Sequence, residues 1–111
     1  MTKSKKTDPY VTVCKTSDIA PGAVRVFAVG DHDVAVANAD GQFYAFADVC
    51  THDGGPLAQG DLEGCIIACP RHGARFDIVT GRALSLPAVV PIPVYDLLIV
   101  GDEIRVSRQP K

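Results

Sequence analysis

Apolar and polar residues alternate along much of this chain with a period of two, which is the period of a strand that buries one face. The pattern predicts strands over residues 10–15, 23–29, 34–37, 42–47, 63–68, 76–79, 94–100 and 103–107. No stretch of a dozen residues places apolar side chains at i, i+3 and i+4, so no long helix is expected. The one candidate for a helical turn is residues 56–59.

Turn residues separate these strands. Asn38-Ala39-Asp40-Gly41 predicts a hairpin, because Asn, Asp and Gly tolerate the backbone angles of a tight reversal. Gly101-Asp102 predicts a second hairpin between the last two strands. The stretch 86–93 holds three prolines, which cannot donate to a sheet ladder, so it is expected to be an extended edge or a surface loop. The whole pattern predicts an all-β barrel or sandwich with a loop-rich insertion near residues 50–74.

The size and charge of the chain exclude several classes of protein. Its 111 residues suffice for one domain, so we expect a single domain over residues 1–111. The formal net charge of −2 argues against a nucleic-acid binder, which usually carries a basic stripe. No stretch is apolar enough to span a bilayer. The first lysines precede no apolar run of a secretory signal, so we expect a flexible terminus over residues 1–9 and a soluble, cytoplasmic protein without a membrane partner.

Four cysteines, an even number, raise the question of a disulfide framework. Two features argue against it: no export signal is present, and a histidine accompanies both Cys50 and Cys69. Cys14 and Cys65 have no such companion and fall in predicted strands, where buried cysteine behaves as a small hydrophobe. We therefore expect Cys14 and Cys65 to be structural.

The segments that carry chemistry are Cys50-Thr51-His52 and Cys69-Pro70-Arg71-His72. Each follows a predicted strand and opens a loop, so the two loops can lie side by side, each presenting one thiolate and one imidazole. Thiolates favour iron–sulfur or zinc chemistry, and imidazole suits either. Zinc remains open, although Cys-x-His is tighter than the usual finger spacing and no recognition helix follows. In a 2Fe–2S centre one iron would take both thiolates and the other both imidazoles.

These segments resemble a known family. Residues 50–57 and 69–73 are similar to the two halves of the Rieske motif. Residues 74–77, Thr80-Gly81 and the proline-containing stretch from Leu86 also resemble the small bacterial Rieske ferredoxins.

The resemblance implies the Rieske fold, with three stacked antiparallel sheets and a cluster-binding subdomain over about residues 48–76. It also implies one 2Fe–2S cluster whose buried iron is held by Cys50 and Cys69. The outer iron, near the surface where the electron leaves, would be held by His52 and His72.

Two departures from the respiratory Rieske proteins carry information. Those proteins join an extra cysteine in each loop as a disulfide, where this chain has Gly55 and Arg71. They also use a serine and a tyrosine to donate hydrogen bonds to cluster sulfurs, where this chain has Ala74 and Phe76. Fewer donors stabilise the reduced, more negative cluster less, so we expect a low reduction potential of roughly −150 mV.

Residues beside the motif have two interpretations. Arg71, Arg75 and Arg82 are either solvated loop charges or part of a surface that steers an acidic partner. Leu86 and Pro87 are candidates for a segment that covers the cluster, as the resemblance implies.

The chain lacks the residues of an oxygenase. A mononuclear iron needs a separate 2-His-1-carboxylate set, and of the three histidines only His32 is left. No glycine-rich segment for a flavin or nicotinamide is present. We therefore expect no enzyme but an electron carrier, taking single electrons from a flavin-dependent reductase. The resemblance implies a ring-hydroxylating dioxygenase as the terminal acceptor. The alternatives are a small Rieske subunit of a nitrite-reductase-like complex, and a redox- or iron-sensing or assembly-linked accessory protein.

Overall fold

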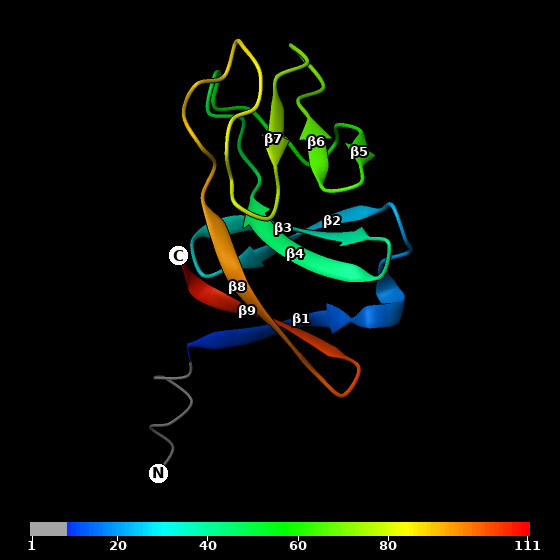
Figure 1. The fold of residues 1–111 in the computed structure, drawn as a ribbon. Coiled ribbons are helices and arrows are strands. Elements are labelled where there is room, and N and C mark those ends of the chain that lie inside the picture. Colours follow the sequence, from blue (N-terminus) through cyan, green and yellow to red (C-terminus); the bar gives the residue numbers. More distant parts are fainter. Residues whose placement is uncertain (1–8) are drawn as a thin grey trace.

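The computed structural model describes residues 9–111, which form a molecule built almost wholly of strands (Figure 1). The strands of this part of the chain are β1 (Tyr10–Lys15), β2 (Val24–Val29), β3 (His32–Ala39), β4 (Gln42–Ala47), β5 (Leu62–Glu63), β6 (Ile66–Ala68), β7 (Arg75–Asp77), β8 (Val94–Val100) and β9 (Glu103–Pro110). A short 3-10 helix, η1 (Thr16–Asp18), follows β1. Apart from Pro9, the flexible terminus expected over residues 1–9 lies outside the described residues.

The strands form two antiparallel sheets, a large one of order β1-β9-β8-β4-β3-β2 and a small one of order β5-β6-β7. The small sheet lies at one end of the molecule (Figure 1). Only the pairs Ala45–Tyr95 and Phe46–Val94 join β4 to β8, so the large sheet divides into two halves that bend around a common core. The all-β, barrel-like fold with a separate subdomain is thus confirmed. The three stacked sheets that the resemblance implies are two sheets by hydrogen bonding, because β4 and β8 pair and join two of them into the large sheet.

The hairpin between β3 and β4 fixes the centre of the large sheet. Its turn consists of Asp40 and Gly41, whose φ angles of 53° and 93° are both positive, as a two-residue reversal between twisted strands requires. Asn38 is buried at the end of β3, where its side chain accepts a bond from the Gly41 N–H and donates to the carbonyl of Ile19. The predicted hairpin is confirmed, with Asn38 and Ala39 belonging to the strand and not to the turn.

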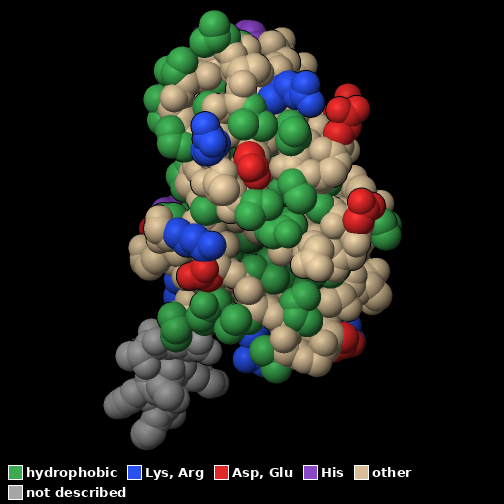
Figure 2. Space-filling model, viewed as in Figure 1, with side chains coloured by type: hydrophobic (Ala, Val, Ile, Leu, Met, Phe, Trp, Pro, Cys, Tyr) green, Lys and Arg blue, Asp and Glu red, His purple; other side chains and the backbone are tan. Residues whose placement is uncertain are grey.

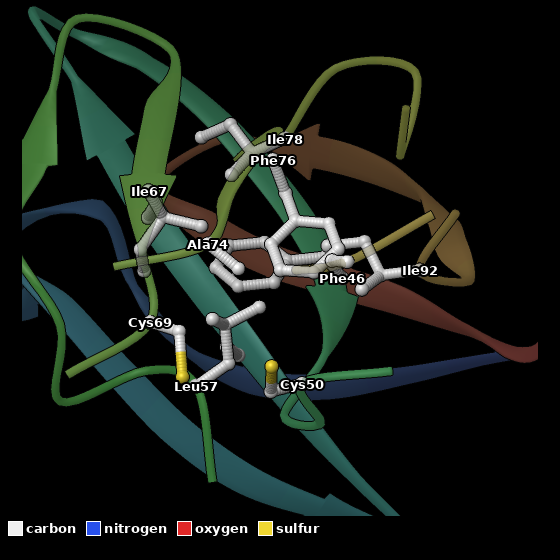
Figure 3. Packing of buried hydrophobic residues seen from close by; sticks show 12 residues of the cluster. Phe46, Cys50, Leu57, Ile67, Cys69, Ala74, Phe76, Ile78 and Ile92 are labelled. Carbon is white, nitrogen blue, oxygen red and sulfur yellow. The ribbon is translucent and has the colours of Figure 1, made fainter. Parts of the chain in front are cut away.

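Strand β3 separates two hydrophobic cores. Its valines, Val34 and Val36, pack into the core of the large sheet, while Ala35 and Ala37 face a second core under the small sheet. Successive side chains of a strand point to opposite faces, so a strand between two cores buries both sets. The second core also contains Cys50 and Cys69, and Figure 3 shows both sulfurs at its margin.

Two short segments differ from the sequence prediction. Residues 63–68 are not one strand but parts of a hairpin, in which Gly64, with a φ of 60°, turns β5 into β6. Residues 56–59 form no helical turn. The chain there makes a single β-turn, closed by the Gly60 N–H, which donates to the carbonyl of Leu57 over 3.0 Å. Among the described residues no helix is long and apolar enough to cross a bilayer.

Candidate metal centre

Two loops of the same design carry the predicted ligands. In the first loop (residues 48–60) the N–H of Cys50 donates to the carbonyl five residues on, and the N–H of Gly54 donates back to Cys50, over 2.8 and 2.6 Å. In the second loop (residues 69–74) Cys69 and Gly73 repeat this pattern over 2.7 and 2.9 Å. Gly54 and Gly73 both have a positive φ, near 75°, which glycine adopts without strain. Each cysteine therefore begins a closed turn that returns the chain past its own backbone.

Side chains and the core hold the first loop in place. The carboxylate of Asp48 accepts hydrogen bonds from the N–H groups of Leu57 and Ala58, over 2.8 and 2.7 Å. The Leu57 side chain is completely buried beside the two cysteines (Figure 3). These contacts fix the backbone on which Cys50 and His52 are mounted.

The four predicted ligands are brought together at the tip of the small subdomain. Cys50 and Cys69 are buried, and their sulfurs lie within 4.8 Å of each other. His52 and His72 are exposed, with ring centroids 4.9 Å apart and nearly perpendicular planes. The arrangement is a pair of thiols inside and a pair of imidazoles outside.

Two backbone N–H groups of its own loop act on each cysteine sulfur. Burial raises the pKa of the Cys50 thiol, while the N–H groups of His52 and Asp53 act against that rise. At Cys69 burial acts in the same direction, but the N–H groups of Arg71 and His72 and the neighbouring Cys50 thiol outweigh it, so the pKa of Cys69 lies below its ordinary value. Hydrogen-bond donors aimed at sulfur are what stabilises an anionic sulfur ligand out of water.

Sequence reasoning missed one residue of the site, Asp53. One oxygen of its carboxylate lies within 4.8 Å of both cysteine sulfurs. The carboxylate also contacts the Arg71 guanidinium and the His72 ring. The Arg71 hydrogen bond holds the pKa of the Asp53 carboxyl well below its usual range, and Asp53 in turn raises that of Arg71. The only sequence signal was the presence of opposite charges in the two motifs, three residues after Cys50 and two after Cys69.

The donor set fits an iron–sulfur cluster better than a single zinc ion. A tetrahedral zinc would need all four ligand atoms around one point. The atoms that converge belong to Cys50, Cys69 and Asp53, and the histidine nitrogens lie outside this compact group. Two thiols side by side and two imidazoles side by side match a centre in which one iron takes sulfur ligands and the other nitrogen ligands.

The remaining candidates lie away from the centre or are already engaged. All four cysteines are free thiols, with Cys14 in β1 and Cys65 in the turn between β5 and β6. Arg71 is paired with Asp53, and Arg75 lies 3.8 Å from Glu63. A steering role for these arginines stays a prediction.

The proline-containing stretch is the expected loop, and it packs against the first loop. Ala88 and Ile92 are buried in the core that contains the two cysteines. The hydroxyl of Thr51 donates to the carbonyl of Val90, which ties the stretch to the residue before His52. Leu86, by contrast, is 77% exposed, so it contributes little to the cover predicted for it.

Comparisons with known proteins agree with this geometry. A family model described as "Rieske [2Fe-2S] domain" matches residues 9–96. The chain is 39% identical to "Ferredoxin CarAc" of Metapseudomonas resinovorans, covering 92% of this chain and 96% of the relative. It is 36% identical to the ferredoxin component of biphenyl 2,3-dioxygenase from Rhodococcus jostii, over 86% and 89%. A chain in the solved complex of reduced oxygenase and oxidised ferredoxin of carbazole 1,9a-dioxygenase has a TM-score of 0.88 and 38% identity, over 93% of this chain and 96% of that one.

Proposed function

This chain belongs to the Rieske [2Fe-2S] domain family, and we propose that it carries single electrons to an oxygenase on a 2Fe–2S cluster held by Cys50, His52, Cys69 and His72. When bound, such a cluster takes up and releases one electron, at a potential that its imidazole ligands raise above that of an all-cysteine centre. The observation that carries the proposal is the pairing of two buried thiols with two exposed imidazoles on twin loops.

Different residues provide the two properties that an electron carrier needs, a shielded cluster and an exposed edge. The cysteines lie in the core with Leu57, which keeps water away from the sulfur ligands. The histidines lie at the surface, so an electron leaves or enters through the side of the molecule that a partner can touch. The third histidine, His32, begins β3 in the large sheet, and within residues 9–111 it is not part of the group of potential metal ligands at the two loops.

The relatives support an oxygenase as the electron acceptor. Two curated relatives are named as ferredoxins of, or components of, aromatic-ring dioxygenase systems, and a similar ferredoxin has been solved in complex with its oxygenase. The electron donor would be a flavin-dependent reductase. A permanent subunit of another enzyme would copurify with it in fixed ratio, and a sensor would change a binding affinity with cluster state.

The first test is electron paramagnetic resonance of the dithionite-reduced protein, with iron and acid-labile sulfide assayed on the same sample. We expect a rhombic signal of a mixed Cys/His centre and about two irons per chain. Rapid mixing of the reduced protein with an aromatic-ring oxygenase should then reoxidise it at catalytic rates. A colourless protein with stoichiometric zinc would overturn the proposal, as would a reduced cluster that no oxygenase reoxidises.

Exposed apolar side chains beside the histidines indicate where the partner docks. Leu86, Val89 and Val90 are exposed by 77%, 73% and 54%, and Figure 2 shows hydrophobic side chains along the upper left margin, where this loop runs in Figure 1. Because Arg71 is neutralised by Asp53, docking should depend more on apolar contact than on charge. Burying a leucine contributes about 1.5 to 3 kcal/mol. Leu86→Asn should therefore raise the KM of the oxygenase for this protein roughly tenfold.

A matched control exists at the far end of the molecule. Leu98, at 45% exposure, lies near the end of β8 and far from the small sheet (Figure 1), and Leu98→Asn should leave the KM unchanged. Both variants are neutral, so the reduction potential should stay that of the wild type. Equal KM values for the two variants would contradict docking at the Leu86 face.

We expect a low reduction potential because two residues beside the cysteines lack hydroxyl groups. Ala74 and Phe76 are completely buried next to Cys69, and neither has a hydroxyl to donate to a cluster sulfur. We expect a midpoint of roughly −150 mV. Phe76→Tyr should raise it by about 60 mV, because one hydrogen bond to a charged acceptor contributes about 1.5 kcal/mol. Phe43→Tyr, in the other core, is the control, and a redox titration giving the same midpoint for both variants would contradict the explanation.

A further inference from the structure

One side chain of the second loop reaches across to the first loop. Arg71 donates from Nε to one Asp53 oxygen and from Nη2 to the other, over 2.6 and 2.9 Å. Its third donor, Nη1, reaches the carbonyl of Pro56 over 2.7 Å. The bidentate pair uses the planar fork of arginine, a geometry that a lysine cannot reproduce.

The backbone of the first loop is shaped to receive this guanidinium. A Cβ placed on Gly55 would lie 2.8 Å from the guanidinium carbon of Arg71, so a larger residue would displace the guanidinium from the position that it occupies. The N–H of Gly55 donates to Asp53 over 2.9 Å. Asp53 is thus fixed from its own loop and from the opposite one.

The same carboxylate contacts one of the proposed ligands. Nε2 of His72 lies 3.0 Å from Asp53, whose side chain is only 24% exposed. An ionised carboxylate has no proton to give, so Nε2 carries the hydrogen and donates it. Nδ1 then keeps its lone pair free for a metal, and a histidine ligand held through its other nitrogen by a carboxylate is a common second-shell arrangement.

We propose that Asp53 is a positioning residue that sets the ring orientation and tautomer of His72, and that Arg71 holds Asp53 while tying the two cluster loops together. The inference rests on the proposed function, because it assigns the two residues to the ligands of the 2Fe–2S cluster. It predicts that replacing Asp53 and replacing Arg71 shift the balance between reduced and oxidised cluster in opposite directions. With a cluster bound, the negative charge of Asp53 beside the ligand His72 would disfavour an added electron, and the positive charge of Arg71 would favour one.

The test uses the cluster-loaded protein with Asp53→Asn, Arg71→Gln and the double variant. At a fixed applied potential, Asp53→Asn should raise the ratio of reduced to oxidised cluster about threefold to tenfold, and Arg71→Gln should lower it by a similar factor. The double variant should return towards the wild-type ratio. Both single variants should lose the visible absorbance of the cluster several times faster than the wild type. The double variant should lose it no faster than the worse single variant, because one contact is lost in all three.

A conservative variant separates charge from geometry. Arg71→Lys keeps the positive charge, so the reduced-to-oxidised ratio should stay near the wild-type value. It cannot make the bidentate pair and the bond to Pro56 together, so the cluster should still be lost faster. A purely electrostatic role would leave both quantities unchanged in this variant.

The pair Glu63–Arg75 is the matched control. It is another acid–arginine pair of the small subdomain, 3.8 Å apart, and its charged groups pair with each other and not with a histidine. Glu63→Gln and Arg75→Gln should move the ratio and the half-life less than their counterparts at Asp53 and Arg71. The inference is overturned if Asp53→Asn shifts the ratio no further than Glu63→Gln, or if Arg71→Lys keeps the wild-type half-life. A wild-type protein without iron and sulfide would instead overturn the proposed function.

Discussion

Replacing Cys50 or Cys69 with alanine is expected to abolish the binding of iron and acid-labile sulfide. Both side chains are buried, and each supplies one of the two thiols that lie within 4.8 Å of each other. Neither of the other cysteines is placed to substitute, because Cys14 lies in β1 of the large sheet and Cys65 in the β5–β6 turn, at the opposite end of β6 from Cys69. Iron and sulfide assays should fall from about two of each per chain to none, and the reduced sample should give no rhombic signal.

Cys14→Ala and Cys65→Ala are the controls for that experiment. Both remove a half-buried thiol from a strand or turn, and both should retain a full complement of iron and sulfide. The cluster-free Cys50 and Cys69 variants should also unfold at a lower temperature, because metal binding contributes to folding free energy. Loss of iron from Cys65→Ala together with retention by Cys69→Ala would contradict the ligand assignment.

The longer strands could be predicted from the sequence because alternation survives wherever a strand has two distinct environments. β1, β4 and β8 have the bounds that the pattern indicates, and even β3, buried on both faces, keeps small alanines on one side and valines on the other. The β3–β4 turn could also be predicted from the sequence, because only residues that tolerate a positive φ fit it.

The small sheet was harder to predict, for a physical reason. A strand of two residues such as β5 (Leu62–Glu63) is too short to show a period, and the apolar run that includes Cys65 hides the reversal at Gly64. The joining of two sheets through β4 and β8 rests on two residue pairs, which no local pattern encodes.

The ligands could likewise be predicted from the sequence, whereas the contacts that support them could not. The spacing of a cysteine and a histidine within one loop is a local property, so all four predicted ligands could be named from the sequence. The contact between Asp53 and Arg71 joins residues 18 apart in sequence on different loops. It depends on how the loops dock, and docking is decided by the core beneath them.

The turn after β7 contains a glycine, Gly81, that has no room for a side chain. Gly81 has a φ of 86°, donates to the carbonyl of Asp77, and accepts from the N–H of Ile92 over 2.8 Å. A Cβ at this position would lie 2.2 Å from the Ile92 carbonyl oxygen. Ile92 is buried in the core that holds both cysteines, so the close approach of Gly81 is what seats the proline-containing stretch over that core.

Gly81→Ala is therefore expected to lower stability by about 2 to 5 kcal/mol. Left-handed backbone contributes about 1 to 2 kcal/mol of this for a residue with a Cβ, and crowding against Ile92 about 1 to 3 kcal/mol. The thermal midpoint of the cluster-loaded protein, at one scan rate, should fall by at least about 8 °C. The cluster should also bleach faster, since displacement of Ile92 opens the core to water.

Gly22→Ala isolates the clash from the backbone strain. Gly22 has the same φ of 86°, but no atom lies within 4 Å of the Cβ that alanine would add. Its replacement should cost about 1 to 2 kcal/mol and leave the cluster half-life unchanged, because Gly22 precedes β2 in the large sheet, away from both cluster loops. Equal midpoints for the two variants would mean that the Ile92 contact yields without cost, and the seating of the proline-containing stretch would then have to come from Ala88 and the Thr51 hydrogen bond alone.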